Sequence, residues 1–426
     1  MSMTHGRCAR DGLLACLCGA LALLAACGRS GSPGGDAQEA AAIVDDGSPL
    51  ETRPRNARDY QPLFPAQTRA RGIRTGPAVN IEVVTAALTL PFAVEPMPDG
   101  RLLVSEKPGR LRIIDKGVLS PPVDGLPAVR FKAQAGLLDI ALDPDFTGNH
   151  IIYFSYAEER KGGSGLALAS ATLVEGAGNA HLEGVKVLFR QLPVFESDRQ
   201  YGARIVFAAD GKLFLALGER GVEGALGQAQ DLNSHFGKIV RINRDGSVPA
   251  DNPFVGRAGA LPEIWSWGHR NIQAAALDAS GKLWVIEHGP RGGDELNAIR
   301  PGANYGWPVI TYGIDYPGTK VGAGIQQMEG MEQPLYYWDP VIAPCGMMIY
   351  AGELFPEWKG SIFVGGLIGM TLVRLQMEGD KVVGEQWPLP DFHARIRDVQ
   401  QGPDGAIYLL TEEGDHSRLL RLTPAA

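Results

Sequence analysis

The sequence predicts an all-β fold, a six-bladed β-propeller. A pattern of two apolar strands joined by a tight turn recurs six times along the chain, and regular repetition of such units is typical of propellers. The 55 glycines and 30 prolines fit a chain that is dense in turns. Long amphipathic helical periodicity is absent from the sequence. A two-sheet sandwich is the alternative, which regular repeats of this length disfavour.

Each repeat is a hairpin in which Asp-Gly, or a similar turn, separates two apolar strands, and Asp-Gly is a strong hairpin signal. The copies start about 45 to 75 residues apart, as in other arrays of β units. In several copies a further strand follows, for example at 111–114 and 419–422, which predicts sheets of about four strands. The copies start at Phe92, Leu137, Arg204, Ile272, Gly346 and Ile396.

The first 27 residues are predicted to be an export signal. Arg7 and Arg10 precede the apolar run "LLACLCGALALLAAC" at 13–27, which is too short for a comfortable membrane span. The run ends in Leu-Ala-Ala-Cys, which resembles a bacterial lipobox. Cys27 is therefore expected to be lipidated and to anchor an exported protein on the periplasmic side of a bacterial membrane. Signal cleavage at a small-residue site, without lipid, is the alternative.

The rest of the chain divides into a predicted tether and a predicted domain. Residues 28–77 are rich in small and polar residues, glycine and proline, a composition typical of flexible linkers. Residues 78–426 are expected to form the folded domain. Of the five cysteines only Cys345 lies beyond the signal, so no disulfide framework or thiolate metal cluster is expected. The net charge of -8 argues against a nucleic-acid partner.

The sixth repeat opens with "RIRDV" at 395–399, which places two arginines two positions apart. In an extended strand Arg395 and Arg397 point to the same side, and His393 shares that parity. Like charges side by side repel unless an anion lies between them. The stretch opens the sixth repeat, at the start of an innermost strand, so we expect an anion at one mouth of the central channel. The alternative is a surface strand whose arginines form salt bridges, with Asp398 nearby.

Six stretches in order along the chain carry a family resemblance. They are "QAGLLDIALDPDF", "GKIVRINRDGSVPADNPF", "PEIWSWGHRN", "EHGPRGGDELN", "GANYGWPVITYGIDY" and "RIRDV". Together they resemble the soluble pyrroloquinoline-quinone-dependent sugar dehydrogenases, and more closely the bacterial aldose sugar dehydrogenase branch. The resemblance covers about residues 79–424. The fold of that family is a six-bladed propeller, which agrees with the repeats counted independently.

The resemblance implies pyrroloquinoline quinone, a flat cofactor with three carboxylates, and a calcium ion that polarises a quinone carbonyl. Arg395 and Arg397 match the cofactor-binding pair of the family, since a planar guanidinium can bind a carboxylate bidentately. The other positions that match cofactor contacts are Gln134, Arg270 and Asn271, and the carbonyls of Gly289 and Pro290 match calcium ligands.

A second, structural calcium is also implied by the resemblance. The candidate ligands are the Glu295 carboxylate and the Tyr305 carbonyl, because calcium prefers oxygen ligands of both kinds. The alternative is that Asp294 and Glu295 only cap a turn.

The sequence departs from the family pattern where the chemistry lies. The family has a base, a histidine, four residues before the arginine that opens the third repeat, and here that position is Gln200. Glutamine has no nitrogen that titrates near neutral pH. A lysine that usually follows the "GGL" strand is replaced by Ile368. In "HRNIQA", Ile272 and Ala275 stand where the family has proline and glycine.

Other residues could replace the missing base. Asp198 and Glu196 lie in the same loop as Gln200, and His393 shares the parity of the arginine pair. Each also has an ordinary interpretation, as a solvated loop acid or a structural histidine. His235 in "NSHFGKIVRI" precedes a separate family motif and is interpreted as structural.

Two functions from different classes follow from these observations. The first is an exported, lipid-anchored quinoprotein that oxidises the C1 hydroxyl of an aldose sugar to a lactone and passes electrons to a small acceptor. The second is a propeller lipoprotein that binds a sugar or anionic ligand without turnover, which the loss of the base favours. A calcium-dependent lactonase is weaker, because fold alone does not transfer function.

Overall fold

The computed structural model describes residues 45–176 and 178–425, and the prediction of a six-bladed β-propeller is confirmed. Six sheets of four or five strands follow one another along the chain. Their first strands start within two residues of the six predicted positions. Cys27 and the predicted export signal lie outside the described residues.

The blades are built from consecutive strands. Blade one contains β3 (Pro91–Pro96), β4 (Leu102–Glu106), β5 (Arg110–Asp115) and β6 (Val118–Leu119). Blade two contains β7 (Leu137–Leu142), β8 (Ile151–Arg160), β9 (Gly163–Val174) and β10 (His181–Arg190). Blade three contains β11 (Gly202–Phe207), β12 (Leu213–Leu217), β13 (Lys238–Ile242) and β14 (Ile264–Trp267).

The second half of the chain continues this pattern. Blade four contains β15 (Ile272–Leu277), β16 (Leu283–Glu287), β17 (Asp294–Ile299) and β18 (Tyr336–Trp338). Blade five contains β19 (Pro344–Ile349), β20 (Ile362–Gly366), β21 (Leu372–Glu378), β22 (Lys381–Gln386) and the short β1 (Gly72–Ile73). Blade six contains β23 (Ile396–Gln401), β24 (Ile407–Thr411), β25 (Ser417–Pro424) and β2 (Val79–Leu88). The helices are single turns: α1 (Phe146–Asn149), α2 (Glu223–Leu226), η1 (Gly227–Gln230), η2 (Pro356–Trp358) and η3 (Gly414–His416).

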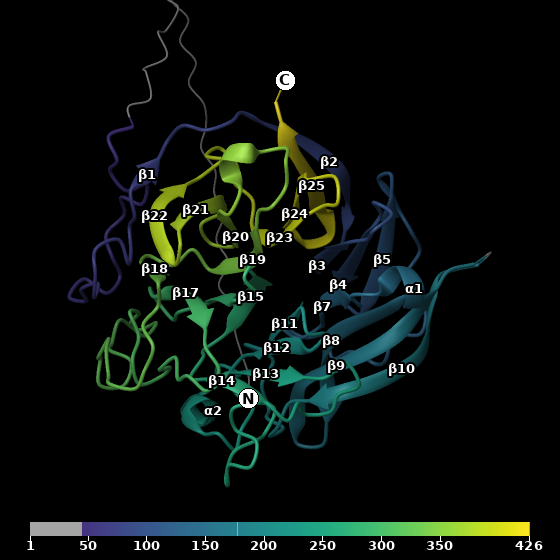
Figure 1. Cartoon of the computed structure of the whole chain (residues 1–426), viewed down its shortest axis with the longest axis horizontal. Coiled ribbons are helices and arrows are strands. Elements are labelled where there is room, and N and C mark those ends of the chain that lie inside the picture. Colours follow the sequence, from purple (N-terminus) through teal and green to yellow (C-terminus); the bar gives the residue numbers. More distant parts are fainter. Residues whose placement is uncertain (1–44, 177, 426) are drawn as a thin grey trace, which may run out of the picture. The chain divides into compact units, whose positions relative to one another are not determined.

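The first strand of each blade lines the centre of the ring (Figure 1). Neighbouring first strands contact one another in the order β3, β7, β11, β15, β19 and β23, and β23 contacts β3 again. The ring is closed within blade six, where β2 from the start of the domain pairs with β25 from the C-terminus. Because a strand from the other end of the domain completes blade six, the first and last blades of the ring are joined.

The predicted hairpin turns explain why the strands form where they do. Gly100, Gly211 and Gly405 each follow an aspartate in a turn between two strands, and all three have positive φ angles, of 88°, 78° and 79°. Glycine adopts this backbone region without steric cost. The flanking strands bury almost every residue; in β4, β12 and β24 all five residues are buried. Burial on both faces is expected where blades pack against one another.

The described part of the predicted tether differs from the prediction. Residues 45–77 belong to the same compact unit as the blades. β1 pairs in parallel with β22, and the amides of Asn56 and Ala57 donate to the Asp339 carboxylate at 2.8 and 3.0 Å. Tyr60 is buried. The linker-like composition did not indicate these contacts, because the partners lie on distant blades.

Among the described residues, no helix has the length and apolar character needed to cross a membrane.

Candidate functional site

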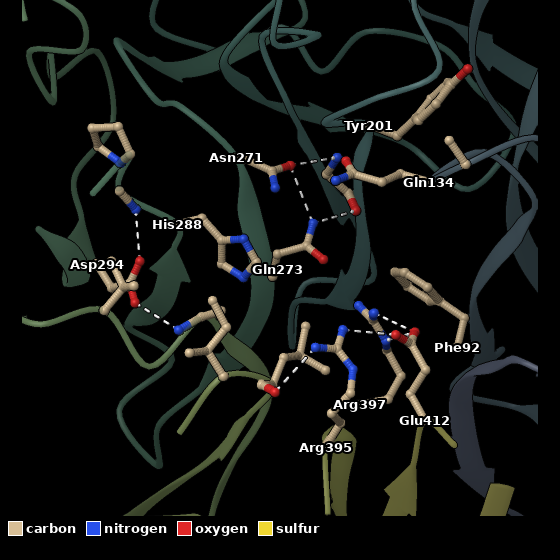
Figure 2. Close-up of a pocket in the computed structure, with 18 of the residues that line it drawn as sticks. Phe92, Gln134, Tyr201, Asn271, Gln273, His288, Asp294, Arg395, Arg397 and Glu412 are labelled. Atoms are coloured by element: carbon tan, nitrogen blue, oxygen red, sulfur yellow. Dashed lines mark hydrogen bonds and ion pairs between the residues drawn. The ribbon is translucent and has the colours of Figure 1, made fainter. Parts of the chain in front are cut away.

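A cavity of about 440 Å³ lies at one mouth of the central channel (Figure 2). All six blades contribute to its wall at or just before their first strands, through Phe92, Leu138, Gly202, Gln273, Ala343 and Arg397. The cavity lies within the range of ~300–1,000 Å³ that is usual for small-molecule sites. Of the residues that the sequence predicts for a cofactor site, Gln134, Asn271, Gly289, Pro290, Arg395 and Arg397 line it.

Arg395 and Arg397 both contact the carboxylate of Glu412, which was not predicted as a site residue. Nη2 of Arg395 lies 2.9 Å from Oε1 of Glu412, and Nε of Arg397 donates to Oε2 of the same residue at 2.8 Å. Burial alone would raise the pKa of Glu412, but the charges of Arg397 and Arg395 lower it to about 2. Glu412 is therefore ionised at neutral pH, and it holds both guanidiniums at the cavity wall.

The register of blade six could have indicated this contact. Ile396 in β23 pairs with Thr411 in β24, and the amide of Glu412 donates to the carbonyl of Arg395 at 2.9 Å. β23 starts only at Ile396, so the strand parity assumed for His393 does not extend that far. His393 is exposed and does not line the cavity.

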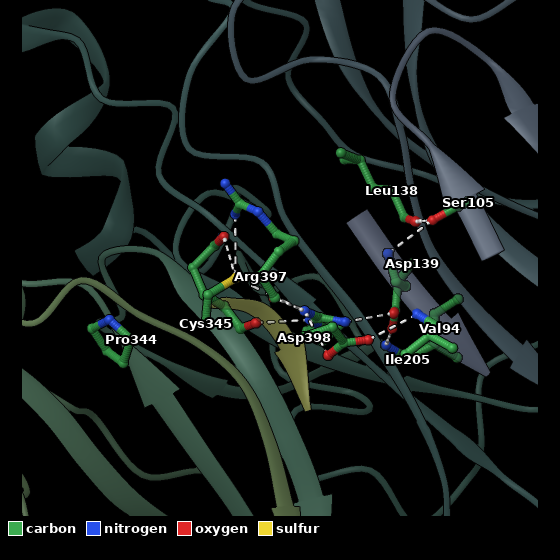
Figure 3. A network of polar contacts seen from close by, with 12 residues as sticks. Val94, Ser105, Leu138, Asp139, Ile205, Pro344, Cys345, Arg397 and Asp398 are labelled. Carbon is green, nitrogen blue, oxygen red and sulfur yellow. Dashed lines mark hydrogen bonds and ion pairs between the residues drawn. The ribbon is translucent and has the colours of Figure 1, made fainter. Parts of the chain in front are cut away.

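A second polar network lies next to Arg397 (Figure 3). Nη1 of Arg397 donates to the Cys345 sulfur at 3.2 Å. Arg204 forms ion pairs with Asp139 at 2.9 Å and with Asp398 at 3.2 Å. Asp398 thus pairs with Arg204, and it is not the partner of the pair at 395 and 397. Arg204, Asp139 and Asp398 are buried, and their charges are paired with one another.

Amide side chains form another part of the wall. Oε1 of Gln134 accepts from the backbone amide of Gln200 at 2.7 Å. Oδ1 of Asn271 accepts from the amide of Gly202 at 3.3 Å and from Nε2 of Gln273 at 3.2 Å. These bonds fix the amides of blades two, three and four relative to one another at the cavity.

The loop of Gly289 and Pro290 is held from behind by Arg270. Nη1 of Arg270 donates to the carbonyls of His288 at 3.0 Å and Gly289 at 2.8 Å. Arg270 is buried, stands 5.2 Å from the ring centroid of Trp307, and does not line the cavity. In this structure its guanidinium supports the loop, whereas the resemblance implied a direct cofactor contact.

Asp294 fixes the other side of the same loop. Oδ1 of Asp294 accepts from the amide of Gly289 at 2.9 Å, and Oδ2 accepts from the amides of Ile342 and Ala343, each at 2.8 Å. Burial raises the pKa of Asp294 to about 7, although the three amide bonds oppose the shift. The turn-capping interpretation therefore holds for Asp294.

His288 lines the cavity and was not predicted as a site residue. Its Nε2 lies 2.8 Å from the carbonyl of Pro344; a carbonyl only accepts, so Nε2 carries the proton. Burial, together with the charge of Arg270, lowers the pKa of His288 to about 3. The imidazole is therefore neutral at physiological pH.

Gln200, where the family has its base, lies between a carboxylate and a guanidinium. With the amide oriented to satisfy both neighbours, its nitrogen donates to Oε1 of Glu219 at 2.5 Å and its oxygen accepts from Nη2 of Arg270 at 3.2 Å. Burial raises the pKa of Glu219 to about 7, although Arg270 opposes the shift. The second oxygen of Glu219, Oε2, is buried without a partner. Glu219 was not among the site residues predicted from the sequence.

Neither Gln200 nor the candidate replacement bases are among the residues that line the cavity. Asp198 pairs with Arg130 at 2.6 Å and with Lys132 at 2.9 Å. The bond from Arg130 lowers the pKa of Asp198, and Lys132 adds to the effect. Glu196 is exposed and lies 3.2 Å from Arg130. His235 is a satisfied core residue, as predicted: Nδ1 accepts from the amide of Leu192 at 2.9 Å, and Nε2 lies 2.7 Å from Glu263.

The second predicted calcium site lies in blade four. Glu295 on β17 stands opposite Glu287 on β16, and burial together with the Glu287 charge raises the pKa of Glu295 well above its usual range. The ring of Tyr305 stacks on His269 at 4.7 Å between centroids. Among the residues that the structure describes, no three or more His, Cys, Asp or Glu side chains are grouped to hold a metal. Calcium binding by Glu295 and Tyr305 stays a prediction.

The glucose/sorbosone dehydrogenase family matches residues 88–421. The aldose sugar dehydrogenase YliI of Escherichia coli (strain K12) is 39% identical over 368 residues, which cover 85% of this chain and 98% of that protein.

Solved structures agree with this match. The soluble aldose sugar dehydrogenase from Escherichia coli, in its apo-form, is 40% identical, with a TM-score of 0.78 over 82% of this chain and 100% of the other. The PQQ-bound aldose sugar dehydrogenase from Streptomyces coelicolor is 28% identical, with a TM-score of 0.65 over 82% of this chain and 99% of the other.

Proposed function

The chain belongs to the glucose/sorbosone dehydrogenase family, and on that premise we propose that it is a quinoprotein that oxidises the C1 hydroxyl of an aldose sugar to a lactone. The proposed cofactors are pyrroloquinoline quinone and calcium. The observation that carries the proposal is the pair Arg395 and Arg397 in the wall of the axial cavity, oriented by Glu412. Export, lipidation at Cys27 and a small electron acceptor belong to the same proposal.

The cavity fits a planar polyanion. Arg397 uses its nitrogens on Glu412 and Cys345, and Arg395 on Glu412 and the Leu367 carbonyl. A guanidinium carries more N–H donors than these contacts use, so both side chains can still bind a ligand carboxylate. Phe92 and Leu138 supply apolar surface in the same wall. Charged donors beside apolar surface are the chemistry that a flat, carboxylated ring requires.

The carbonyls of Gly289 and Pro290 are the proposed calcium ligands. Arg270 already donates to the Gly289 carbonyl, but a carbonyl oxygen has a second lone pair for a cation. Asp294 and Arg270 hold this loop from two sides, so its carbonyls are oriented before any ligand binds. When bound, the quinone would supply a hydride acceptor and the calcium a Lewis acid.

The residues of the chain would bind and orient the sugar, but none is a strong base in the expected place. Gln200 cannot accept a proton near neutral pH, and Arg130 and Lys132 hold Asp198 in its ionised form and lower its pKa. A general base typically contributes about 10²- to 10⁴-fold to the rate. We therefore expect slow turnover, with water as the proton acceptor.

A second candidate function is binding of a sugar or anionic ligand without turnover. The specific observation that favours it is Gln200, a residue without a titratable group, in the place of the family base. The scaffold around the cavity is the same for both candidates, so only catalysis separates them.

The test follows cofactor binding and sugar oxidation together. The full-length protein, purified in detergent, is titrated with pyrroloquinoline quinone in the presence of calcium, and dye reduction with glucose and other aldoses is then measured. Binding with turnover is the expected result. Binding without turnover would support the second candidate, and no binding at all would refute the quinoprotein proposal.

A further inference from the structure

Lys107 lines the cavity beside the arginine pair and has no assigned role. It directly follows β4 in blade one. Arg395 and Arg397 both contact Glu412. In contrast, among the described residues Lys107 takes part in no ion pair within 4 Å, and Glu412 is paired with the two arginines. An ammonium that lies half-buried in a cavity wall without a partner has donors available for a ligand.

The backbone of Lys107 is held in place between two blades. Its amide donates to the carbonyl of Leu90 at 3.0 Å, and its carbonyl accepts from the amide of Leu137 at 3.0 Å. Gly136 packs directly on this backbone: a Cβ at Gly136 would lie 2.6 Å from the Lys107 carbonyl oxygen. A side chain at 136 would therefore displace Lys107. The stem of the lysine thus starts from a fixed point at the cavity mouth.

The charges around Lys107 favour an anion. Burial lowers the pKa of Lys107, the Glu412 carboxylate opposes this shift, and the charges of Arg397 and Arg395 add to it. Three cationic side chains therefore face a single ionised carboxylate, Glu412, in this part of the wall. Asp294, the other acid in the lining, is used by three backbone amides of its own loop. A bound carboxylate would reduce the repulsion between the three cations.

We propose that Lys107 binds a carboxylate of the quinone cofactor as a third cation, alongside Arg395 and Arg397. This inference rests on the proposed function. It also accounts for Ile368, which lines the same cavity with 54% of its surface exposed and carries no charge. The family resemblance implies a lysine at position 368; in this chain Lys107 of blade one supplies the cation instead. Lys107 therefore adds a cation beside the arginine pair although one family position has lost its charge.

The test measures cofactor affinity without any sugar. The unmodified protein and the variants Lys107→Met, Lys107→Arg and Lys381→Met are titrated with pyrroloquinoline quinone at constant calcium and salt. Lys381 is an exposed lysine of β22 outside the cavity and serves as the matched control. A lost charge-assisted contact should weaken binding about ten- to a hundredfold in Lys107→Met. Lys107→Arg should stay within a few-fold of the unmodified protein, and Lys381→Met should be unchanged.

A double variant tests whether a loss of quinone affinity comes from the lost charge or from damage to the fold. Adding Ile368→Lys to Lys107→Met should recover most of the lost affinity, because it returns a cation to the lining of the same cavity. Thermal melting of each variant checks the fold. If the unmodified protein binds the quinone and Lys107→Met binds it equally well, this inference is overturned while the proposed function stands. If the double variant fails to recover affinity with an intact fold, the role of charge is overturned. If the unmodified protein binds no quinone, both proposals fall.

Discussion

Replacing Gln200 with histidine is the substitution that should change catalysis most. The surroundings of Gln200 suit an imidazole. Glu219 lies 2.5 Å from the Gln200 amide nitrogen and has an unpartnered second oxygen, so it could accept a hydrogen bond from one ring nitrogen and leave the other free as a base. Position 200 has a φ of 48°, a region where histidine and asparagine are several-fold enriched. Gly221 leaves room, because a Cβ there would lie 2.8 Å from the Gln200 side chain.

The expected gain in Gln200→His is about 10²- to 10⁴-fold in kcat, the usual contribution of a general base. The rate should rise with pH as the imidazole loses its proton near pH ~6.5. Because burial raises the pKa of Glu219 to about 7, ionisation of Glu219 in the same pH range should help to orient the ring.

Dye reduction with saturating sugar and cofactor, measured across pH 5 to 9, is the assay. Gln200→Asn is the control, since it tolerates the same backbone and adds no base. Adding Glu219→Gln to Gln200→His should remove part of the gain. A Gln200→His variant that binds the cofactor normally but gains no activity would refute the assignment of position 200 as the place of the missing base.

Three further perturbations have defined outcomes. Glu412→Gln removes the carboxylate that orients Arg395 and Arg397, so it should lower the melting temperature and weaken quinone binding in a titration; equal or tighter binding would contradict the orienting role of Glu412. Burial raises the pKa of Glu95 from 4.5 to about 8, so the folded state favours the protonated form and the stability of the protein falls as the pH rises from about 4.5 to 8. The melting temperature of Glu95→Gln should therefore be roughly 2 to 4 °C higher than that of the unmodified protein at pH 8 and no higher at pH 4. An equal gain at both pH values would argue against the raised pKa of Glu95. Deletion of residues 79–88 removes β2 and opens blade six, so circular dichroism should show loss of cooperative melting; an unchanged melting curve would mean that β2 does not close the ring.

The fold was largely predictable because its signals are local. Each blade starts with a hairpin whose Asp-Gly turn and apolar strands lie within about 20 residues of one another, so the six starts could be identified without any tertiary information. Closure of the ring by β2 could not be identified in this way, since β2 and β25 come from opposite ends of the domain.

The candidate site was predictable only in part. Arg395, Arg397 and Asn271 lie in short recognisable stretches, and the structure places all three at the cavity. Glu412 and Lys107 lie in ordinary turns after strands, and only strand register and blade packing bring them to the same wall.

The prediction of a flexible tether at residues 28–77 missed the contacts of its described part for a related reason. Its composition is that of a linker, but Asn56 bonds to Asp339, 283 positions away in the chain. Contacts at such a distance leave no mark in the composition of either segment, so composition alone indicated flexibility.

The measurement that tests the central claim most directly is an equilibrium titration of the purified protein with pyrroloquinoline quinone and calcium, beside the same titration of Arg397→Met. The account predicts one quinone bound per chain in the unmodified protein and affinity at least about tenfold weaker in the variant, because the variant loses a charge-assisted contact to a carboxylate. No binding by the unmodified protein, or equal binding by both, would contradict the claim that the arginine pair of the propeller cavity holds this anion.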